Sequence, residues 1–264
     1  SVANRLVIFV GSIIVFVLIS LALKQPSAAA KKKMFAFIVL MMASCVFWTL
    51  YQIAPMGLTL FIKHNVDATI FGFKVTPQWI QNTNTLVIVF GGPVVSALFQ
   101  KLRTRGVAVN IPMQFSFALS LIGVAFVMLT IGISNANAQG LTHINWIFAS
   151  YVLQSLGELL LSPVGYAMIG RLAPQQLQGL MMGSWMMVTG VAATLSNYFS
   201  NMMVQGSQTN DALLTNDNYS YVFSLLGWSA IAASIVFVIL VPMLRRLIDA
   251  RDDHMVEIPD PKPA

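Results

Sequence analysis

The sequence predicts an all-α membrane protein, and three observations carry this prediction. Hydrophobic residues fill 57% of the 264 positions, whereas Asp, Glu, Lys and Arg together fill only 9%. Soluble domains carry about 25% of these four charged residues. The apolar residues form long uncharged runs, and about 20 apolar residues are enough to cross a bilayer as a helix. These runs show no alternation of period two, which argues against a membrane β-barrel.

Seven of the apolar runs are long enough to be membrane spans. We expect each to be helical, because a backbone in lipid must satisfy its polar groups internally. The loop 25–30 separates the first run from the other six, so the first span reads as an accessory helix. The predicted spans cover about residues 5–24, 34–62, 79–101, 107–133, 145–171, 178–204 and 220–247.

The loops between the runs alternate between a basic set and a polar set that is poor in Lys and Arg. The loops 63–78, 134–145 and 205–219 are poor in Lys and Arg. Because Lys and Arg gather in cytoplasmic loops, we predict that the basic side and the carboxy terminus face the cytoplasm. This distribution also accounts for the net charge of +6, so no nucleic-acid partner is expected. The basic set comprises Lys24, Lys31, Lys32, Lys33, Lys101, Arg103, Arg105, Arg171, Arg245, Arg246 and Arg251.

The chain is expected to divide into three parts. Residues 1–33 would be an accessory transmembrane helix with a cytoplasmic linker, and residues 34–248 a six-helix bundle. Residues 249–264 are rich in Asp and Pro. We expect them to be a disordered cytoplasmic tail, because such a composition buries too little apolar surface to fold. The first residue is Ser1 rather than Met, and we expect a truncated chain.

Glu158 lies deep inside a predicted span, whereas the other acidic residues fall in predicted loops or in the tail. A carboxyl group at mid-membrane is costly, so it normally faces a cavity or a partner. Desolvation favours its neutral form and a nearby cation favours its charged form. Glu158 therefore suits a reversible proton or cation site. The alternative is a protonated structural carboxyl bonded to a neighbouring helix.

Three polar or helix-breaking residues accompany Glu158. Ser162 follows four residues later and shares its helix face; it is either a binding group or bonded to its own helix backbone. Pro163 removes one backbone hydrogen bond and loosens the turn before it. The amide of Asn84 can hold a peptide bond or an amine, or it can join two helices by a hydrogen bond.

Trp48 and Trp185 lie inside predicted spans rather than at the membrane interface, where Trp usually collects. They either pack in the core or form the wall of an apolar pocket.

The three His residues fall in loops or the tail, so no buried metal site is expected. The sequence contains no phosphate-binding loop and no dinucleotide fingerprint, which argues against an ATP-driven mechanism. No second catalytic group accompanies Glu158, so we do not expect an enzyme.

Several segments together resemble the proton-dependent oligopeptide transporter family of the major facilitator superfamily. The segment Gly-Glu-Leu-Leu-Leu-Ser-Pro-Val-Gly at 157–165, followed by Arg-Leu-Ala-Pro at 171–174, resembles the tenth core helix and its loop. Phe47-Trp48 with Leu-Thr-Leu-Phe at 58–61 resembles the seventh helix. Asn84, nine residues before Pro93, resembles the eighth helix, and Trp185 the eleventh. The first span is similar to a linker helix found in bacterial members.

The resemblance implies the carboxy-terminal six-helix bundle of a major facilitator superfamily transporter plus one preceding linker helix. Within the family, the chain looks most like bacterial dipeptide and tripeptide permeases. The implied activity is proton-coupled symport of di- and tripeptides into the cell by alternating access, across the bacterial cytoplasmic (inner) membrane. Protons would be the coupling ion, and no cofactor is implied. The implied partners are peptides, protons, membrane lipid and an amino-terminal six-helix half that carries further basic residues.

The resemblance also assigns roles to residues of this chain. Glu158 and Asn84 would hold the amino end of the peptide, and Glu158 would carry the coupling proton. Trp48, Trp185 and Ser162 would shape the side-chain pockets. These five residues are the predicted substrate-binding set.

Gln52 departs from the family pattern, because an acidic residue often stands there and pairs with a cation of the other half to close the outer gate. A neutral Gln cannot make that ion pair, so the energetics of the gate would differ from the family pattern. Gln52 and Pro163 are the predicted gating positions.

Two other functions remain open. One is a transporter of the same superfamily for organic cations or drugs, since a carboxyl group among Trp residues also suits a cation. The other is a noncatalytic membrane subunit.

Overall fold

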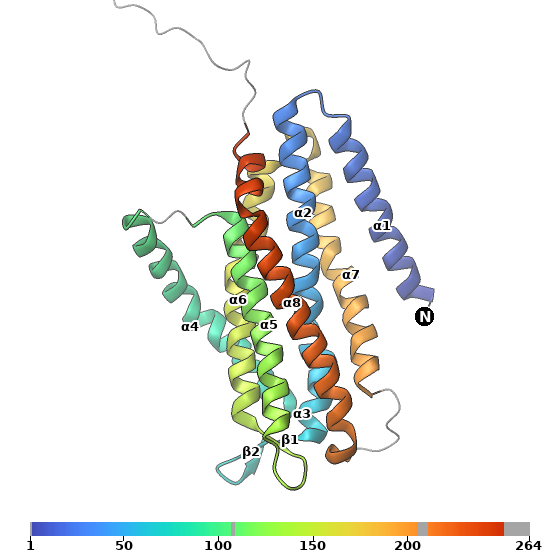
Figure 1. Cartoon of the computed structure of the whole chain (residues 1–264), viewed down its shortest axis with the longest axis vertical. Helices are drawn as coiled ribbons and strands as arrows, with labels where there is room; N and C mark the ends of the chain where they lie inside the picture. Colours follow the sequence, from blue (N-terminus) through green and yellow to red (C-terminus); the bar gives the residue numbers. More distant parts are fainter. Residues whose placement is uncertain (1, 107–108, 205–210, 251–264) are drawn as a thin grey trace, which may run out of the picture.

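The computed structural model describes residues 2–106, 109–204 and 211–250, and these are nearly all helical. Within these residues, seven helical segments are long and apolar enough to cross a membrane. The predicted all-α membrane fold is therefore confirmed. In chain order the elements are α1 (Val2–Leu23), α2 (Ala28–Tyr51), η1 (Ala54–Leu58), α3 (Thr59–Asn65), β1 (Val66–Asp67), β2 (Thr69–Ile70), β3 (Phe73–Lys74), α4 (Pro77–Thr104), α5 (Ile111–Ser134), β4 (Thr142–His143), α6 (Ile144–Leu172), η2 (Gln175–Leu177), α7 (Gln178–Val204) and α8 (Ala212–Ile248) (Figure 1).

The last span begins at Ala212, eight residues before the predicted start at 220, so part of the predicted loop is helical. The helix begins where Asp211 caps it by accepting a hydrogen bond from the backbone N–H of Leu213 at 3.0 Å. Its polar first turns are satisfied by tertiary partners. The amide nitrogen of Asn65 donates to Thr215 Oγ1 at 2.7 Å and to Asn216 Oδ1 at 2.9 Å. Polarity alone therefore misplaced this boundary.

The second span also starts earlier than predicted. Ser27 caps α2 by accepting a hydrogen bond from the backbone N–H of Ala30 at 3.2 Å, and the helix begins at Ala28. The predicted basic loop at 31–33 consequently lies in the first turns of α2. Residues 251–264 of the predicted tail lie outside the described residues.

The second span is continuous but not regularly helical. After α2 ends at Tyr51, the π-helical turn η1 intervenes before the chain continues as α3. The backbone N–H of Leu58 reaches back five residues to the carbonyl of Ile53, at 3.1 Å. Pro55 sits at the start of η1 and has no N–H to donate. Such π turns recur at functional sites because they shift side chains relative to a regular helix.

Two glycines let α5 and α8 pack backbone to backbone. A Cβ atom at Gly123 would lie 2.9 Å from the carbonyl oxygen of Gly227, and one at Gly227 would lie 2.9 Å from the carbonyl oxygen of Gly123. Farther along, the Ser116 and Ser234 hydroxyls each donate to the other's carbonyl, at 3.0 and 2.8 Å. Small residues permit this close packing in lipid, where hydrophobicity does not drive helices together.

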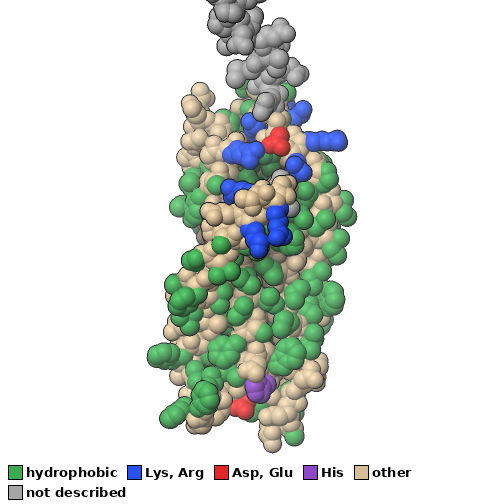
Figure 2. All heavy atoms as spheres, turned by 90° about the vertical axis from the view of Figure 1, so that its left-hand side faces the viewer, with side chains coloured by type: hydrophobic (Ala, Val, Ile, Leu, Met, Phe, Trp, Pro, Cys, Tyr) green, Lys and Arg blue, Asp and Glu red, His purple; other side chains and the backbone are tan. Residues whose placement is uncertain are grey.

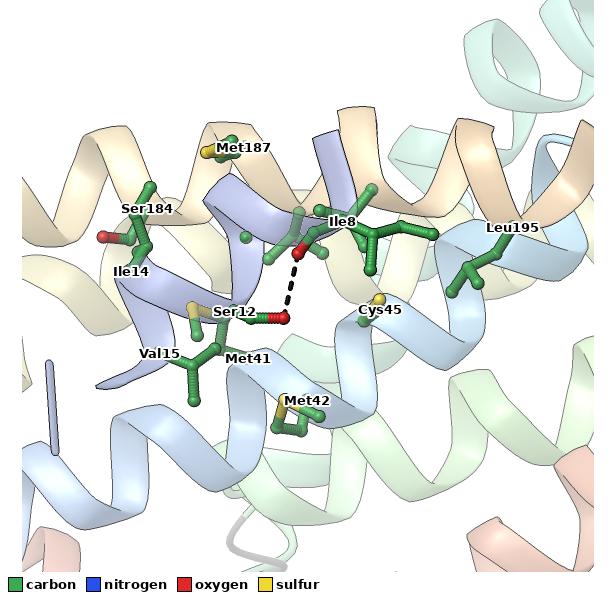
Figure 3. Close-up of a pocket in the computed structure, with 13 residues that line it drawn as sticks. Ile8, Ser12, Ile14, Val15, Met41, Met42, Cys45, Ser184, Met187 and Leu195 are labelled. Carbon is green, nitrogen blue, oxygen red and sulfur yellow. Dashed lines mark hydrogen bonds between the residues drawn. The ribbon is translucent and has the colours of Figure 1, made fainter. Parts of the chain in front are cut away.

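Helix α1 packs beside α2 and α7 at the edge of the bundle (Figure 1). A Cβ atom at Gly11 would lie 2.8 Å from Val191 of α7. The three helices line an apolar cavity of about 390 Å³ (Figure 3). The Ser12 hydroxyl in this cavity donates back to its own helix, to the carbonyl of Ile8 at 2.9 Å. The cavity shares no lining residue with the Glu158 site described below.

Helix α4 leans away from the other helices in Figure 1. Ile80 is its buried residue, and its remaining apolar side chains are largely exposed. Figure 2 shows Lys and Arg side chains gathered toward one end of the molecule, with a band of hydrophobic side chains below them. The opposite end carries α3 and the short strands. There β1 pairs in parallel with β4, and β2 pairs antiparallel with β3.

Candidate functional site

Glu158 is held where three helices meet. It lies half-buried on α6, and its Oε2 atom accepts hydrogen bonds from the Tyr51 hydroxyl of α2 and from Asn84 Nδ2 of α4, the latter at 3.2 Å. Both hydrogen bonds go to the same carboxylate oxygen. Within the part of the chain that the structure describes, Oε1 is therefore the oxygen that remains for an incoming donor.

Asn84 is the hub of the hydrogen-bond network. Its Nδ2 atom lies 2.8 Å from the Tyr51 hydroxyl oxygen and 2.9 Å from Ser155 Oγ, in addition to its contact with Glu158. A side-chain amide has two N–H donors, so these three acceptors compete for two hydrogens. Ser155 is itself fixed by donating to the carbonyl of Tyr151 at 2.7 Å. A change at any one acceptor therefore redistributes the hydrogen bonds of the others.

The sequence interpretation found Glu158 and Asn84 but missed Tyr51 and Ser155. Both could have been found from helical spacing. Tyr51 lies three residues after Trp48, and Ser155 lies three residues before Glu158, so each shares a helix face with its neighbour. The rings of Trp48 and Tyr51 pack edge to face, with centroids 5.3 Å apart. The Trp48 ring therefore packs against Tyr51, which donates to the carboxyl group of Glu158.

An aromatic cavity of about 170 Å³ lies beyond Glu158 along α6. It brings together Trp48, Ser162 and Trp185, which are three of the predicted site residues. Tyr166, Met186 and Thr189, which the sequence interpretation did not select, complete the lining. The cavity has the character of a small ligand pocket, with apolar walls and a few hydroxyl groups.

Trp185 is fixed in this cavity by a glycine on α6. Its side chain is 5% exposed, and its ring centroid lies 6.3 Å from that of Phe115. A Cβ atom added at Gly165 would lie 2.2 Å from Cζ2 of the indole ring. The missing side chain at Gly165 therefore provides the space that the indole fills.

A second, polar cavity of about 130 Å³ lies on the other side of Glu158. Tyr151 and Gln154 border it from the turns of α6 that precede Glu158. Gln81 borders it from the start of α4. Tyr51 and Asn84, which bond to Glu158, complete its polar lining, while Ala54 and Pro55 contribute from η1. The carboxyl network therefore separates a polar cavity from an aromatic one.

Gln52 and Pro163 are placed outside the linings of both cavities. Gln52 is half-buried and caps the end of α2, where its backbone N–H donates to the carbonyl of Trp48 at 2.9 Å. Pro163 is exposed, and α6 continues past it to Leu172. Their gating roles stay predictions.

The substitution Gly165→Ala is expected to destabilise the protein, because the new methyl group overlaps the buried indole of Trp185. Overpacking of this kind costs about 1–3 kcal/mol. Thermal unfolding of the purified protein, followed by intrinsic Trp fluorescence, measures the effect. Gly179→Ala is the control, since a Cβ atom there meets nothing within 4 Å in the described structure. Equal melting temperatures for the two variants would contradict the packing described.

The comparisons with known proteins agree on one family. The family model described as the POT family matches residues 2–222. Dipeptide and tripeptide permease A of Serratia proteamaculans is 35% identical over 248 residues, which are 94% of this chain and 48% of the permease. The permease A of Escherichia coli is 32% identical over 241 residues, covering 91% of this chain and 47% of the permease. The chain thus spans about half the length of the curated relatives it matches.

Solved structures give the same answer for the fold. A mutant of the peptide transporter POT in complex with sulfate is similar with a TM-score of 0.80 and 26% identity, over 92% of this chain and 47% of that chain. A POT family transporter in complex with a thioalcohol-conjugated peptide is similar with a TM-score of 0.77 and 21% identity, over 91% of this chain and 48% of that chain. The chain therefore belongs to the POT family.

Proposed function

We propose that this chain forms the carboxy-terminal half of a symporter that carries di- and tripeptides into the cell together with protons. One observation carries the proposal. A carboxyl group inside a membrane span, Glu158, is held by Tyr51 and Asn84 between a polar cavity and an aromatic cavity. The names of the relatives, which are peptide permeases and peptide transporters, support the same substrate class.

The geometry suits a peptide bound by its amino end. A peptide presents an ammonium group, an amide and a side chain within a few ångströms of one another. The Glu158 carboxylate can accept hydrogen bonds from the ammonium group, and the carbonyl oxygen of Asn84 can accept another. The side chain can enter the aromatic cavity, where Trp48 and Trp185 offer apolar walls and Ser162 offers a hydroxyl group.

Proton coupling follows from what protonation does to the same carboxyl group. Hydrogen bonds to a charged acceptor contribute about 1.5–3 kcal/mol each, whereas neutral ones contribute about 0.5–1.5 kcal/mol. Protonation of Glu158 therefore weakens its hydrogen bonds with Tyr51 and Asn84, which tie α6 to α2 and α4. A proton thus biases the packing of the three helices that surround the site, as alternating access requires.

The chain is a multi-pass membrane protein, and we propose that its basic end and carboxy terminus face the cytoplasm of a bacterial cell. The gathering of Lys and Arg toward one end supports this orientation (Figure 2). The amino-terminal half would cover the exposed apolar face of α4, and lipid would surround the outer helices. Protons are the coupling ion, and the proposal requires no cofactor. Gln52 and Pro163 are the proposed gating positions, beside η1 and within α6.

We propose the same three-part organisation that the sequence indicates. Residues 1–33 comprise the accessory helix, the link to the bundle and the first turns of α2, and residues 34–248 form the rest of the six-helix transporter bundle. Residues 249–264 form a cytoplasmic tail. The apolar contact surface that α1 shares with α2 and α7 fits an accessory helix at the edge of the bundle.

Uptake of a labelled dipeptide by the intact gene product in liposomes tests the proposed function. An inward proton gradient should drive accumulation of the dipeptide above its outside concentration. Collapse of the gradient should release the accumulated dipeptide. A competition panel of dipeptides, tripeptides and cationic amines separates the proposal from an organic-cation transporter. Inhibition by the amines alone, or uptake that ignores the proton gradient, would overturn the proposal.

A further inference from the structure

The backbone of the second span departs from regular helical bonding where α2 gives way to η1. In a regular helix the N–H of Ile53 would donate to the carbonyl of Thr49, four residues back. Here it donates to the carbonyl of Leu50 at 3.1 Å. On the far side of the break, the carbonyl of Ile53 accepts from Leu58 at 3.1 Å rather than from Gly57. The Thr49 carbonyl and the Gly57 N–H therefore need partners outside their own helix.

Two serines of α7 bond to these two backbone groups. The Ser196 hydroxyl donates to the carbonyl of Thr49. The Ser200 hydroxyl accepts from the N–H of Gly57 at 3.1 Å. The serines are four residues apart, so they share one face of α7, and they are 0% and 6% exposed. An unpaired backbone group in such a buried place costs about as much as a lost hydrogen bond. We call the pair Ser196 and Ser200 the α7 clip.

The backbone of η1 lies directly against α7 at Gly57. A Cβ atom added at Gly57 would lie 2.6 Å from Met203 Sδ and 3.3 Å from Ser200 Cα. A side chain at this position would therefore push η1 away from Ser200. The close approach lets the N–H of Gly57 reach the Ser200 hydroxyl, so the α7 clip holds η1 by backbone contact and not through a flexible side chain of η1.

Tyr51 lies between the two backbone groups that the α7 clip holds. It follows Thr49 by two residues and precedes Gly57 by six. It is also the last residue of α2, and its hydroxyl donates to Glu158 Oε2. The place that this hydroxyl takes beside Glu158 therefore depends on how α7 holds the end of α2.

We propose that Ser196 and Ser200 are positioning residues, which hold the end of α2 where the Tyr51 hydroxyl reaches Glu158. The hydrogen bond from Tyr51 occupies Glu158 Oε2 and so leaves Oε1 directed at the amino end of the peptide. This inference rests on the proposed peptide symport and adds two residues of α7 to its site. Neither serine borders the aromatic or the polar cavity, so their effect on the peptide passes through α2.

The test measures initial rates of labelled dipeptide uptake by the intact protein in liposomes, over a range of dipeptide concentrations. The double variant Ser196→Ala with Ser200→Ala removes both bonds of the α7 clip. We expect the half-saturating dipeptide concentration to rise about tenfold, the lower end of what a hydrogen bond to a charged group contributes. The maximal rate should stay close to that of the wild type, because the coupling carboxyl group is untouched.

Tyr51→Phe separates a positioning role from a general loss of packing. This change removes the hydroxyl itself, so it should raise the half-saturating concentration by a similar factor. Adding Tyr51→Phe to the double variant should cause no further rise, because the α7 clip then has no hydroxyl to place. Residues that act through one interaction show such non-additivity.

Ser184→Ala is the matched control on the same helix. Ser184 is 3% exposed, and its hydroxyl donates at 2.7 Å to the carbonyl of Leu180 in its own helix. Both the half-saturating concentration and the maximal rate should match those of the wild type. If the double variant does not fold, Ser200→Ala alone is combined with Tyr51→Phe, since the bond from Ser196 then remains.

Three outcomes would overturn the inference. Factors that multiply when Tyr51→Phe is added would show that the serines act independently of Tyr51. A fall in the maximal rate without a change in the half-saturating concentration would show a purely structural role. Either result leaves the symport function standing, because the wild type still transports dipeptide. A wild type without saturable dipeptide uptake would overturn the symport function and the positioning role together.

Discussion

Replacing Glu158 with Gln is expected to abolish the accumulation of dipeptide against its concentration gradient. Gln has nearly the same shape, and its side-chain oxygen can still accept from Tyr51 and Asn84. It cannot bind a proton reversibly, and it cannot offer a full negative charge to an ammonium group. The variant should therefore fold, which size-exclusion chromatography of the purified protein checks, while labelled dipeptide in liposomes never exceeds the outside concentration.

Asp217→Asn is the matched control for this prediction, because it makes the same chemical change at an exposed position of α8. We expect the control to accumulate dipeptide as the wild type does. Accumulation by the Glu158→Gln variant at the wild-type level would remove Glu158 from the proton path. Loss of accumulation in both variants would show instead that the assay reports general charge effects.

Replacing Asn84 with Leu is expected to have the second largest effect. The change removes the donor that reaches Tyr51, Ser155 and Glu158 while keeping a side chain of similar size. A hydrogen bond to a charged group contributes about 1.5–3 kcal/mol, so the apparent dipeptide affinity should fall roughly 10- to 150-fold. The concentration dependence of initial uptake rates by the intact protein measures this change.

Asn82→Leu provides the control for Asn84, since Asn82 lies on the same helix, is exposed and borders neither cavity. Its half-saturating dipeptide concentration should match that of the wild type. If the two Asn variants weaken transport equally, the effect belongs to helix α4 as a whole and not to the hydrogen bonds of Asn84.

The number and type of spans could be predicted from sequence, because lipid forces long apolar runs into helices. The boundaries that failed were set by tertiary contacts. The polar residues Thr215 and Asn216 looked like a loop, yet Asn65 from α3 satisfies them and the helix extends to Ala212. Likewise, Pro55 is visible in the sequence, but the length and geometry of η1 depend on how the turn packs.

The site was predictable where a residue type is unusual for its surroundings. Glu158 stood out as an acid in lipid, and the structure brings Asn84 to its side. Ser196 and Ser200 gave no such signal, because a Ser in a membrane helix is ordinary. Their interest arises only from the break in the second span that they bond to, which is a property of the folded chain.

Proton movement during transport is the most direct measure of symport by this protein. Liposomes containing the intact protein and a pH-sensitive dye inside, with equal pH on both sides at the start, receive dipeptide outside. We expect the lumen to acidify as labelled dipeptide enters, and we expect the Glu158→Gln variant to produce no acidification. Entry of labelled dipeptide into wild-type liposomes without any change of lumenal pH would contradict symport.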